Sequence, residues 1–202
     1  IEVDKITGVA DRVWSADLNK TVCEPVRDVL GIEDIESAYK AQQINTDRKT
    51  ANGARIIGRK IGLTSFAVQK QLGVDQPDFG VLTDNMHVNE IDPVPMVELM
   101  QPKAEAEIAF ILSKDIIDEN LDMNVLINSI SYAAPSIEIV GSRIRDWDIR
   151  ITDTIADNAS ASHFVLGESR VSLDGLDLEG CKMKMTRMGE VVSEGQGSAC
   201  MD

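Results

Sequence analysis

The chain has 202 residues, enough for one well-buried core or for one core plus a small helical lobe, and its 43% hydrophobic and 27% charged residues are typical of a globular protein. Its formal net charge of −14 argues against nucleic acid or an anionic membrane as a partner, because binding to phosphate requires a basic surface. No apolar run approaches the roughly 20 residues that a membrane span needs.

The three cysteines, Cys23, Cys181 and Cys200, are far apart in the sequence and form no CxxC pair. An odd number of cysteines at such spacings argues against a disulfide framework and against a thiolate zinc site. We therefore expect a protein of a reducing, cytoplasmic compartment.

The first 55 residues are expected to form a helical N-terminal lobe. Apolar residues recur at helical spacing between Ile6 and Leu18. A second helix is predicted from about Asp34 to Ala51, because acidic residues crowd its first turn and Asn52-Gly53 provides a left-handed stop. Between the two helices, Glu24-Pro25 interrupts the pattern.

From Ile56 onward the pattern favours strands and predicts a β-rich domain over residues 56–202. Strands are expected at 56–62, 103–112, 136–141, 163–166, 182–187 and 191–192. Helices are expected at Phe66–Leu72 and at Met123–Ser131, with Pro135 ending the second, and residues 75–80 read as a turn-rich loop. The predicted fold class is α+β.

A group of acidic residues in apolar strands is the candidate site for chemistry. In the strand Lys103–Leu112, Glu105 and Glu107 point to the same face, roughly 6.6 Å apart along the chain. Glu138 lies in a second apolar strand. Carboxylates held side by side repel one another and are costly to bury, and a divalent cation between them removes both costs. Three carboxylates without histidine or cysteine suit Mg²⁺ or Mn²⁺ rather than zinc.

The residues alone leave this interpretation open. A half-exposed strand with its polar face in water accounts for Glu105 and Glu107 about as well, and somewhat better for Glu138. Lys60, at a strand end among glycines, and Asp78, in the turn-rich loop, also read as surface charges, although loops often carry functional residues. The two histidines have no neighbouring serine or cysteine motif, so a hydrolytic triad has no support.

Several longer motifs resemble those of the 2-keto-4-pentenoate hydratases, enzymes of aromatic meta-cleavage pathways within the fumarylacetoacetate hydrolase superfamily. The matching segments are Glu24–Asp28 (EPVRD), Gly58–Thr64 (GRKIGLT), Gln71–Gly80 (QLGVDQPDFG), Pro102–Phe110 (PKAEAEIAF), Glu138–Trp147 (EIVGSRIRDW) and Asp153–Ser160 (DTIADNAS). The resemblance spans essentially the whole chain, and together the motifs are far more specific than the ExE tripeptide alone.

The resemblance implies a mixed, mainly-β domain of the superfamily's type with a small helical N-terminal lobe. It also assigns residues: Glu105, Glu107 and Glu138 fall on the family's metal ligands, Lys60 and Asp78 on a polar pair near the substrate, and Ser160 on a further position of the substrate pocket. The implied cofactor is Mg²⁺ or Mn²⁺. A homo-oligomer is implied, with pentamer-based assemblies among relatives, and so is a possible complex with other pathway enzymes.

The implied reaction is the hydration of 2-hydroxypenta-2,4-dienoate, a small 2-hydroxy acid, to 4-hydroxy-2-oxopentanoate. The alternatives are a decarboxylase of the 4-oxalocrotonate type, a C–C bond hydrolase and a non-catalytic scaffold subunit. The hydrolase is disfavoured because its relatives use a Glu–His pair that has no counterpart here. Family members continue with further strands beyond the position of Asp202, so we expect the β-rich domain to be C-terminally incomplete in this sequence.

Overall fold

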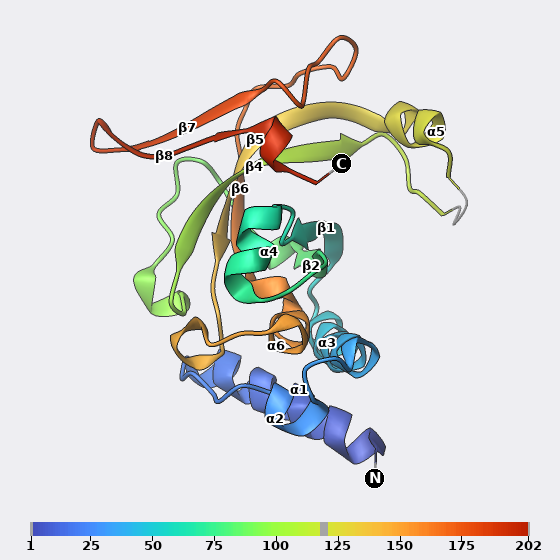
Figure 1. Cartoon of the computed structure of the whole chain (residues 1–202), viewed down its shortest axis with the longest axis vertical. Coiled ribbons are helices and arrows are strands. Elements are labelled where there is room, and N and C mark those ends of the chain that lie inside the picture. The colour runs from blue at the N-terminus through green and yellow to red at the C-terminus, as the bar shows by residue number, and fades with distance from the viewer. Residues whose placement is uncertain (1, 118–120, 202) are drawn as a thin grey trace.

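The computed structural model describes residues 2–117 and 121–201, so residues 118–120 and 202 of the predicted β-rich domain lie outside the described part (Figure 1). Its helices are α1 (Glu2–Asn19), α2 (Arg27–Leu30), α3 (Ile35–Ala51), α4 (Phe66–Leu72), α5 (Met123–Asn128) and α6 (Ile151–Ala156). Its strands are β1 (Ile56–Gly62), β2 (Asp78–Thr83), β3 (His87–Val88), β4 (Lys103–Leu112), β5 (Ile130–Val140), β6 (Ala161–Leu166), β7 (Lys182–Arg187) and β8 (Glu190–Gln196). The protein thus mixes helices and strands, as predicted.

Helices α1, α3 and α6 pack together in a helical layer at one end of the molecule. The buried face of α1 follows helical spacing, with Ile6, Val9 and Val13 packed against Ile144 and Ile155 in one core cluster. The helical core therefore combines the N-terminal segment with a segment from the second half of the chain.

The predicted apolar stripe of α1 was wrong at its end. Leu18 is 65% exposed, whereas Ala16 is buried. Ala16 lies three residues after Val13 and stays on the buried face, while Leu18 lies five residues after it and has rotated out of contact.

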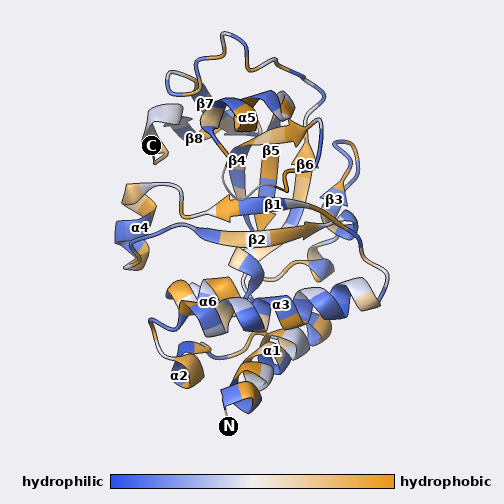
Figure 2. Ribbon diagram, turned by 90° about the vertical axis from the view of Figure 1, so that its right-hand side faces the viewer, coloured by the Kyte–Doolittle hydropathy of each residue, from blue (hydrophilic) through white to orange (hydrophobic). Residues whose placement is uncertain are grey.

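The strands form three separate sheets. Strands β1 and β2 pair antiparallel, β7 and β8 form a second antiparallel pair, and the main sheet has the order β3-β6-β5-β4. Within the main sheet β3 and β6 are parallel and the other neighbours antiparallel. Figure 2 shows β1 and β2 crossing between the helical layer and strands β4, β5 and β6. This position brings the β1–β2 pair between the two other parts of the fold.

Two sequence predictions were wrong, one at the start of β5 and one at the start of β2. The helix α5 ends at Asn128, and Pro135 lies inside β5 rather than after a helix. The strand tolerates this proline because the neighbouring strand β6 ends at Leu166, beside Pro135, so little of the ladder is lost with the missing N–H; the Pro135 carbonyl still accepts a hydrogen bond from Gly167 N at 2.8 Å.

The second error concerns the predicted loop at 75–80, whose last three residues begin strand β2. Asp78 pairs with Gly62 and Gly80 pairs with Lys60 in the antiparallel ladder. Proline and glycine around Asp78 favour a turn locally, but pairing with β1 decides the conformation.

Among the described residues, no helix is both long and apolar enough to cross a membrane.

Candidate metal centre and active site

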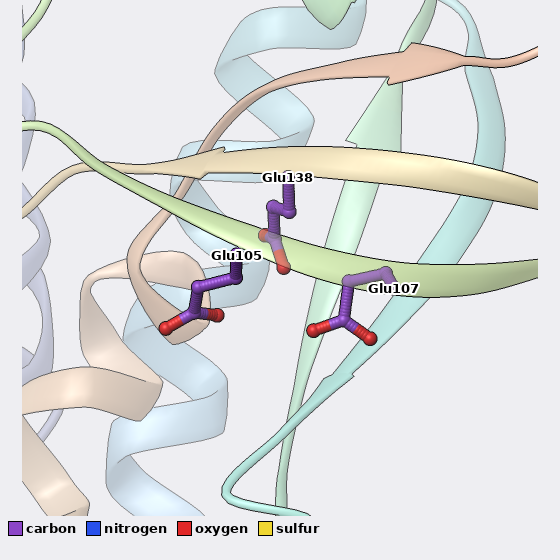
Figure 3. Close-up of side chains that lie close together, drawn as sticks. All are labelled: Glu105, Glu107 and Glu138. Carbon is purple, nitrogen blue, oxygen red and sulfur yellow. The ribbon is translucent and has the colours of Figure 1, made fainter. Parts of the chain in front are cut away.

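Strands β4 and β5 bring the three predicted glutamates together. Glu105 and Glu138 are direct cross-strand partners, and Glu107 lies two residues along β4 on the same face. One carboxylate oxygen from each of the three lies within 4.8 Å of the other two. In Figure 3 the Glu138 side chain extends from β5 toward the two glutamates of β4. This geometry removes the possibility that Glu138 lies on an unrelated, solvated face.

Burial and the neighbouring carboxylates disfavour the negative charges of Glu138 and Glu107. Glu138 is only 6% exposed, and its Oε1 atom is buried without a hydrogen-bond partner. Burial raises the pKa of Glu138 to about 7; Lys60 opposes this shift, and the charges of Glu105 and Glu107 add to it. Burial and the neighbouring Glu105 also raise the pKa of Glu107. Like charges placed opposite each other on a sheet are destabilising, so a cation bound between these carboxylates would stabilise the arrangement.

A divalent cation fits this donor set. Three carboxylates supply only hard oxygen ligands, which suit Mg²⁺, Mn²⁺ or Ca²⁺. The Oε1 atom of Glu138 accepts no hydrogen bond and has only the ion pair with Lys60, so it is the kind of atom that a metal ion would bind. Three protein ligands also leave coordination positions open for substrate and water.

Lys60 extends from β1 to the same site. Its Nζ lies 3.3 Å from Glu138 Oε1, in an ion pair without hydrogen-bond geometry, and donates a 2.6 Å hydrogen bond to the carbonyl oxygen of Ala159. The Lys60 side chain is 9% exposed. A lysine held in this way is not a surface charge, and the structure places it directly beside a candidate ligand.

Asp78 lies next to Lys60 on the β1–β2 pair. It is 1% exposed, and its Oδ2 accepts a 2.8 Å hydrogen bond from the Thr154 hydroxyl. Burial raises the pKa of Asp78, against the opposing effect of the nearby Lys60. This buried acid is therefore easier to protonate than an ordinary aspartate, a property useful to a group that transfers protons.

Two glycines make room for the Lys60 and Asp78 side chains. Lys60 is paired with Gly80, and Asp78 with Gly62, so all four lie on one face of the β1–β2 pair. A Cβ atom on Gly62 would lie 2.3 Å from Asp78 Oδ1 and 3.2 Å from Lys60 Nζ. A Cβ atom on Gly80 would lie 2.6 Å from the Asn158 carbonyl oxygen. Any side chain at these two positions would displace the polar pair or the turn beneath it.

Ser160 lies in an unusual turn, Asn158–Ser160, directly after α6. All three residues have left-handed backbone angles, with φ of 56°, 51° and 56°. Non-glycine residues pay roughly 1–2 kcal/mol each for this conformation, which is concentrated at functional sites. The Ser160 hydroxyl is buried without a partner, while Asn158 exchanges hydrogen bonds of 2.8 and 3.0 Å with the Val81 backbone.

Several residues that surround Lys60 and Asp78 were not predicted from the sequence. Thr154 and the Ala159 carbonyl belong to the DTIADNAS segment, but nothing in its composition indicates a left-handed turn without glycine. Gly62 and Gly80 could have been noticed, because glycines flank Lys60 and follow Asp78 closely in the sequence. His163 is not part of the site. It pairs with Ile139 and so lies on the face of the sheet opposite Glu138.

The chain is similar in sequence to known hydratases. No protein-family model matches the chain. It is 49% identical over 198 residues to a 2-keto-4-pentenoate hydratase of Burkholderia vietnamiensis, covering 98% of this chain and 76% of that protein. A 2-hydroxypent-2,4-dienoate hydratase of Pseudomonas putida is 41% identical over 197 residues, covering 97% of this chain and 89% of that protein.

Among solved structures, the chain is similar to a 4-oxalocrotonate decarboxylase from Pseudomonas putida G7, complexed with magnesium and adipate. The TM-score is 0.90 at 31% sequence identity, covering 98% of this chain and 75% of that one. The fold is thus shared with this decarboxylase, while the more similar sequences are hydratases. On the extent and level of these identities, the chain belongs to the 2-keto-4-pentenoate hydratase family.

Proposed function

We propose that the chain is a hydro-lyase that converts 2-hydroxypenta-2,4-dienoate, the enol of 2-oxopent-4-enoate, to 4-hydroxy-2-oxopentanoate in aromatic meta-cleavage catabolism. The observation that carries the proposal is one site in which three carboxylates meet within 4.8 Å beside the buried Lys60 and Asp78. Membership of a hydratase family identifies the reaction that such a site serves.

The proposed ligands of a divalent ion, Mg²⁺ or Mn²⁺, are Glu105, Glu107 and Glu138. The hard oxygen donors and the Glu138 Oε1 atom, which accepts no hydrogen bond, support this assignment. The similar decarboxylase was solved with magnesium and also with calcium. When bound, the ion supplies Lewis-acid stabilisation of negative charge on the 2-oxygen and carboxylate of the substrate.

The residues around the glutamates bind the substrate and transfer protons. Lys60, fixed by the Ala159 carbonyl and by Glu138, binds the substrate carboxylate. Asp78, whose pKa is raised by burial, transfers protons, and the unpartnered Ser160 hydroxyl hydrogen-bonds to the substrate. In the reaction the 2-hydroxyl loses a proton while C5 gains one, and the resulting unsaturated ketone takes up water across C3 and C4.

The wider architecture is proposed on the same basis. The fold is that of the fumarylacetoacetate hydrolase superfamily, with a helical lobe over residues 1–55 and a β-rich domain over residues 56–202. A homo-oligomer, association with other pathway enzymes and a cytoplasmic location stay predictions from the resemblance.

The decarboxylase alternative is kept because the solved neighbour carries that name. Turnover of 2-hydroxypenta-2,4-dienoate and of 4-oxalocrotonate, measured side by side with saturating Mg²⁺, separates the two reactions. We expect hydration of the first without release of carbon dioxide from the second. Faster release of carbon dioxide would assign the chain to the decarboxylase reaction, and the absence of both reactions would favour the scaffold alternative.

A further inference from the structure

The left-handed turn Asn158–Ser160 is the common support of the proposed catalytic groups. Its Ala159 carbonyl receives the hydrogen bond from Lys60, and its Ser160 hydroxyl is buried without a partner. Thr154, which hydrogen-bonds to Asp78, lies in α6 just before the turn. Because none of the turn residues is glycine, the conformation is unfavourable by itself and must be stabilised by its surroundings.

Arg143 binds the backbone on both sides of the turn. This residue is 7% exposed and lies in the loop after β5, five residues beyond Glu138. Its Nη2 donates to the carbonyl oxygen of Asp157, just before the turn, at 2.8 Å, and to that of Ala161, just after it, at 3.2 Å. One guanidinium group therefore holds both ends of the left-handed segment.

The Asp157 carboxylate completes the arrangement. It accepts hydrogen bonds from the backbone N of Arg143 at 2.9 Å and from Arg143 Nε in a close ion pair, and it is 1% exposed. The bonds between Asn158 and the Val81 backbone fix the other side of the turn to β2, the strand that begins with Asp78. Arg143 thus connects the strand that carries Glu138 to the turn that holds Lys60.

We propose that Arg143 is a positioning residue for the hydration reaction, which holds Lys60 and Ser160 in place by binding both ends of the Asn158–Ser160 turn. The inference rests on the proposed function, because it concerns the productive geometry of that site. Arg143 forms no contact with the three glutamates among the hydrogen bonds and ion pairs of the described residues. Loss of its bonds should therefore impair turnover without impairing metal binding.

The test is the variant Arg143→Lys, with Arg27→Lys as its matched control. Lysine keeps the positive charge beside Asp157 but cannot reach the carboxylate and both carbonyls together, since it lacks the planar fork of arginine. Arg27 makes a comparable set of bonds to Asp148 and to Asp153 at the other end of α6, yet it does not contact the turn. Each variant thus removes a guanidinium group that forms several hydrogen bonds near one end of α6.

For Arg143→Lys we expect kcat to fall by roughly 10- to 100-fold, as small displacements of catalytic groups produce. The Kd for Mg²⁺, measured by calorimetry, should stay within about twofold, as for independent sites. Arg27→Lys should leave kcat near the wild-type value even if it lowers the melting temperature by a similar amount.

An unchanged kcat in Arg143→Lys, or an equal loss of kcat in both variants, would overturn the positioning role. The proposed function would stand in either case if the wild type hydrates the dienoate. If Arg143→Lys does not accumulate as folded protein, Asn158→Ala releases the same turn from β2 and carries the same expectation for kcat and Kd. Failure of the wild-type protein to hydrate the dienoate would instead refute the proposed function.

Discussion

Glu105 of β4 and Glu138 of β5 are direct partners in an antiparallel pair of strands, so their carboxylates face each other on one surface of the sheet. Opposite charges usually occupy such positions, because like charges there are destabilising. The pair, together with Glu107, therefore fits a binding site for a cation better than a contribution to the stability of the sheet.

Replacing Glu138 by glutamine should affect metal binding and the stability of the metal-free protein in different ways. We expect Glu138→Gln to weaken Mg²⁺ binding by more than about tenfold, since a lost ligand should cost at least as much as a lost outer-shell partner. The metal-free variant should be no less stable than the wild type, because a buried charge among like charges has been removed. Calorimetric titration and urea denaturation in EDTA measure the two effects, with Glu190→Gln on the exposed strand β8 as the control.

The raised pKa of Glu138 predicts how stability without metal depends on pH. The folded protein holds the proton up to a pKa of about 7, whereas the unfolded chain releases it near the ordinary glutamate pKa of 4.5. The folded state therefore binds more protons in this range, so the contribution of Glu138 to stability falls as pH rises from about 4.5 to about 7. In EDTA, the stability of the wild type relative to Glu138→Gln should be lower at pH 8 than at pH 5. A difference independent of pH would contradict the burial of this carboxylate.

Asp78 should matter for turnover rather than for metal binding. For Asp78→Asn we expect kcat to fall by about 100-fold or more, as is usual on loss of a general acid–base group. Its Mg²⁺ affinity should be almost unchanged, because Asp78 is not one of the three clustered acids. Steady-state kinetics and calorimetry test this together, with the exposed Asp75→Asn as control. Equal losses in kcat and in metal affinity would move Asp78 into the ion-binding set.

The glycines opposite Lys60 and Asp78 give a test that removes no functional group. In Gly80→Ala the new methyl group would meet the Asn158 carbonyl at 2.6 Å, a backbone atom that cannot rotate away. We expect a loss of about 1–3 kcal/mol in the free energy of unfolding, typical of overpacking, together with reduced turnover. Gly58→Ala, in the partner strand β1, would meet only the Leu82 side chain at 3.7 Å and should be tolerated. Similar behaviour of the two variants would show that the turn does not press against β2.

The sequence predicted the local parts of the site well. Alternation in Lys103–Leu112 predicted β4 with its observed bounds and placed Glu105 and Glu107 on one face. The apolar run around Glu138 was also correctly predicted to be a strand. The partnership of Glu105 with Glu138 could not be predicted from the residues, because the register between strands is decided by tertiary pairing.

The errors have the same physical origin. Asp78 was expected in a loop because glycine and proline surround it, but it begins β2 through pairing with β1. Pro135 was expected to follow a helix, but it lies in β5 where the neighbouring strand ends. The left-handed turn at Asn158–Ser160 is stabilised by Arg143 and Val81, which are distant in sequence, so no local pattern indicates it.

The most direct test of the three-glutamate site is steady-state hydration of 2-hydroxypenta-2,4-dienoate before and after removal of metal. We predict that EDTA abolishes turnover, that added Mg²⁺ or Mn²⁺ restores it in the wild-type protein, and that Glu138→Gln is not restored at the same concentration. Full turnover of the wild type in excess EDTA would contradict the need for a metal ion, and full activity of Glu138→Gln would contradict the role of Glu138 as a ligand.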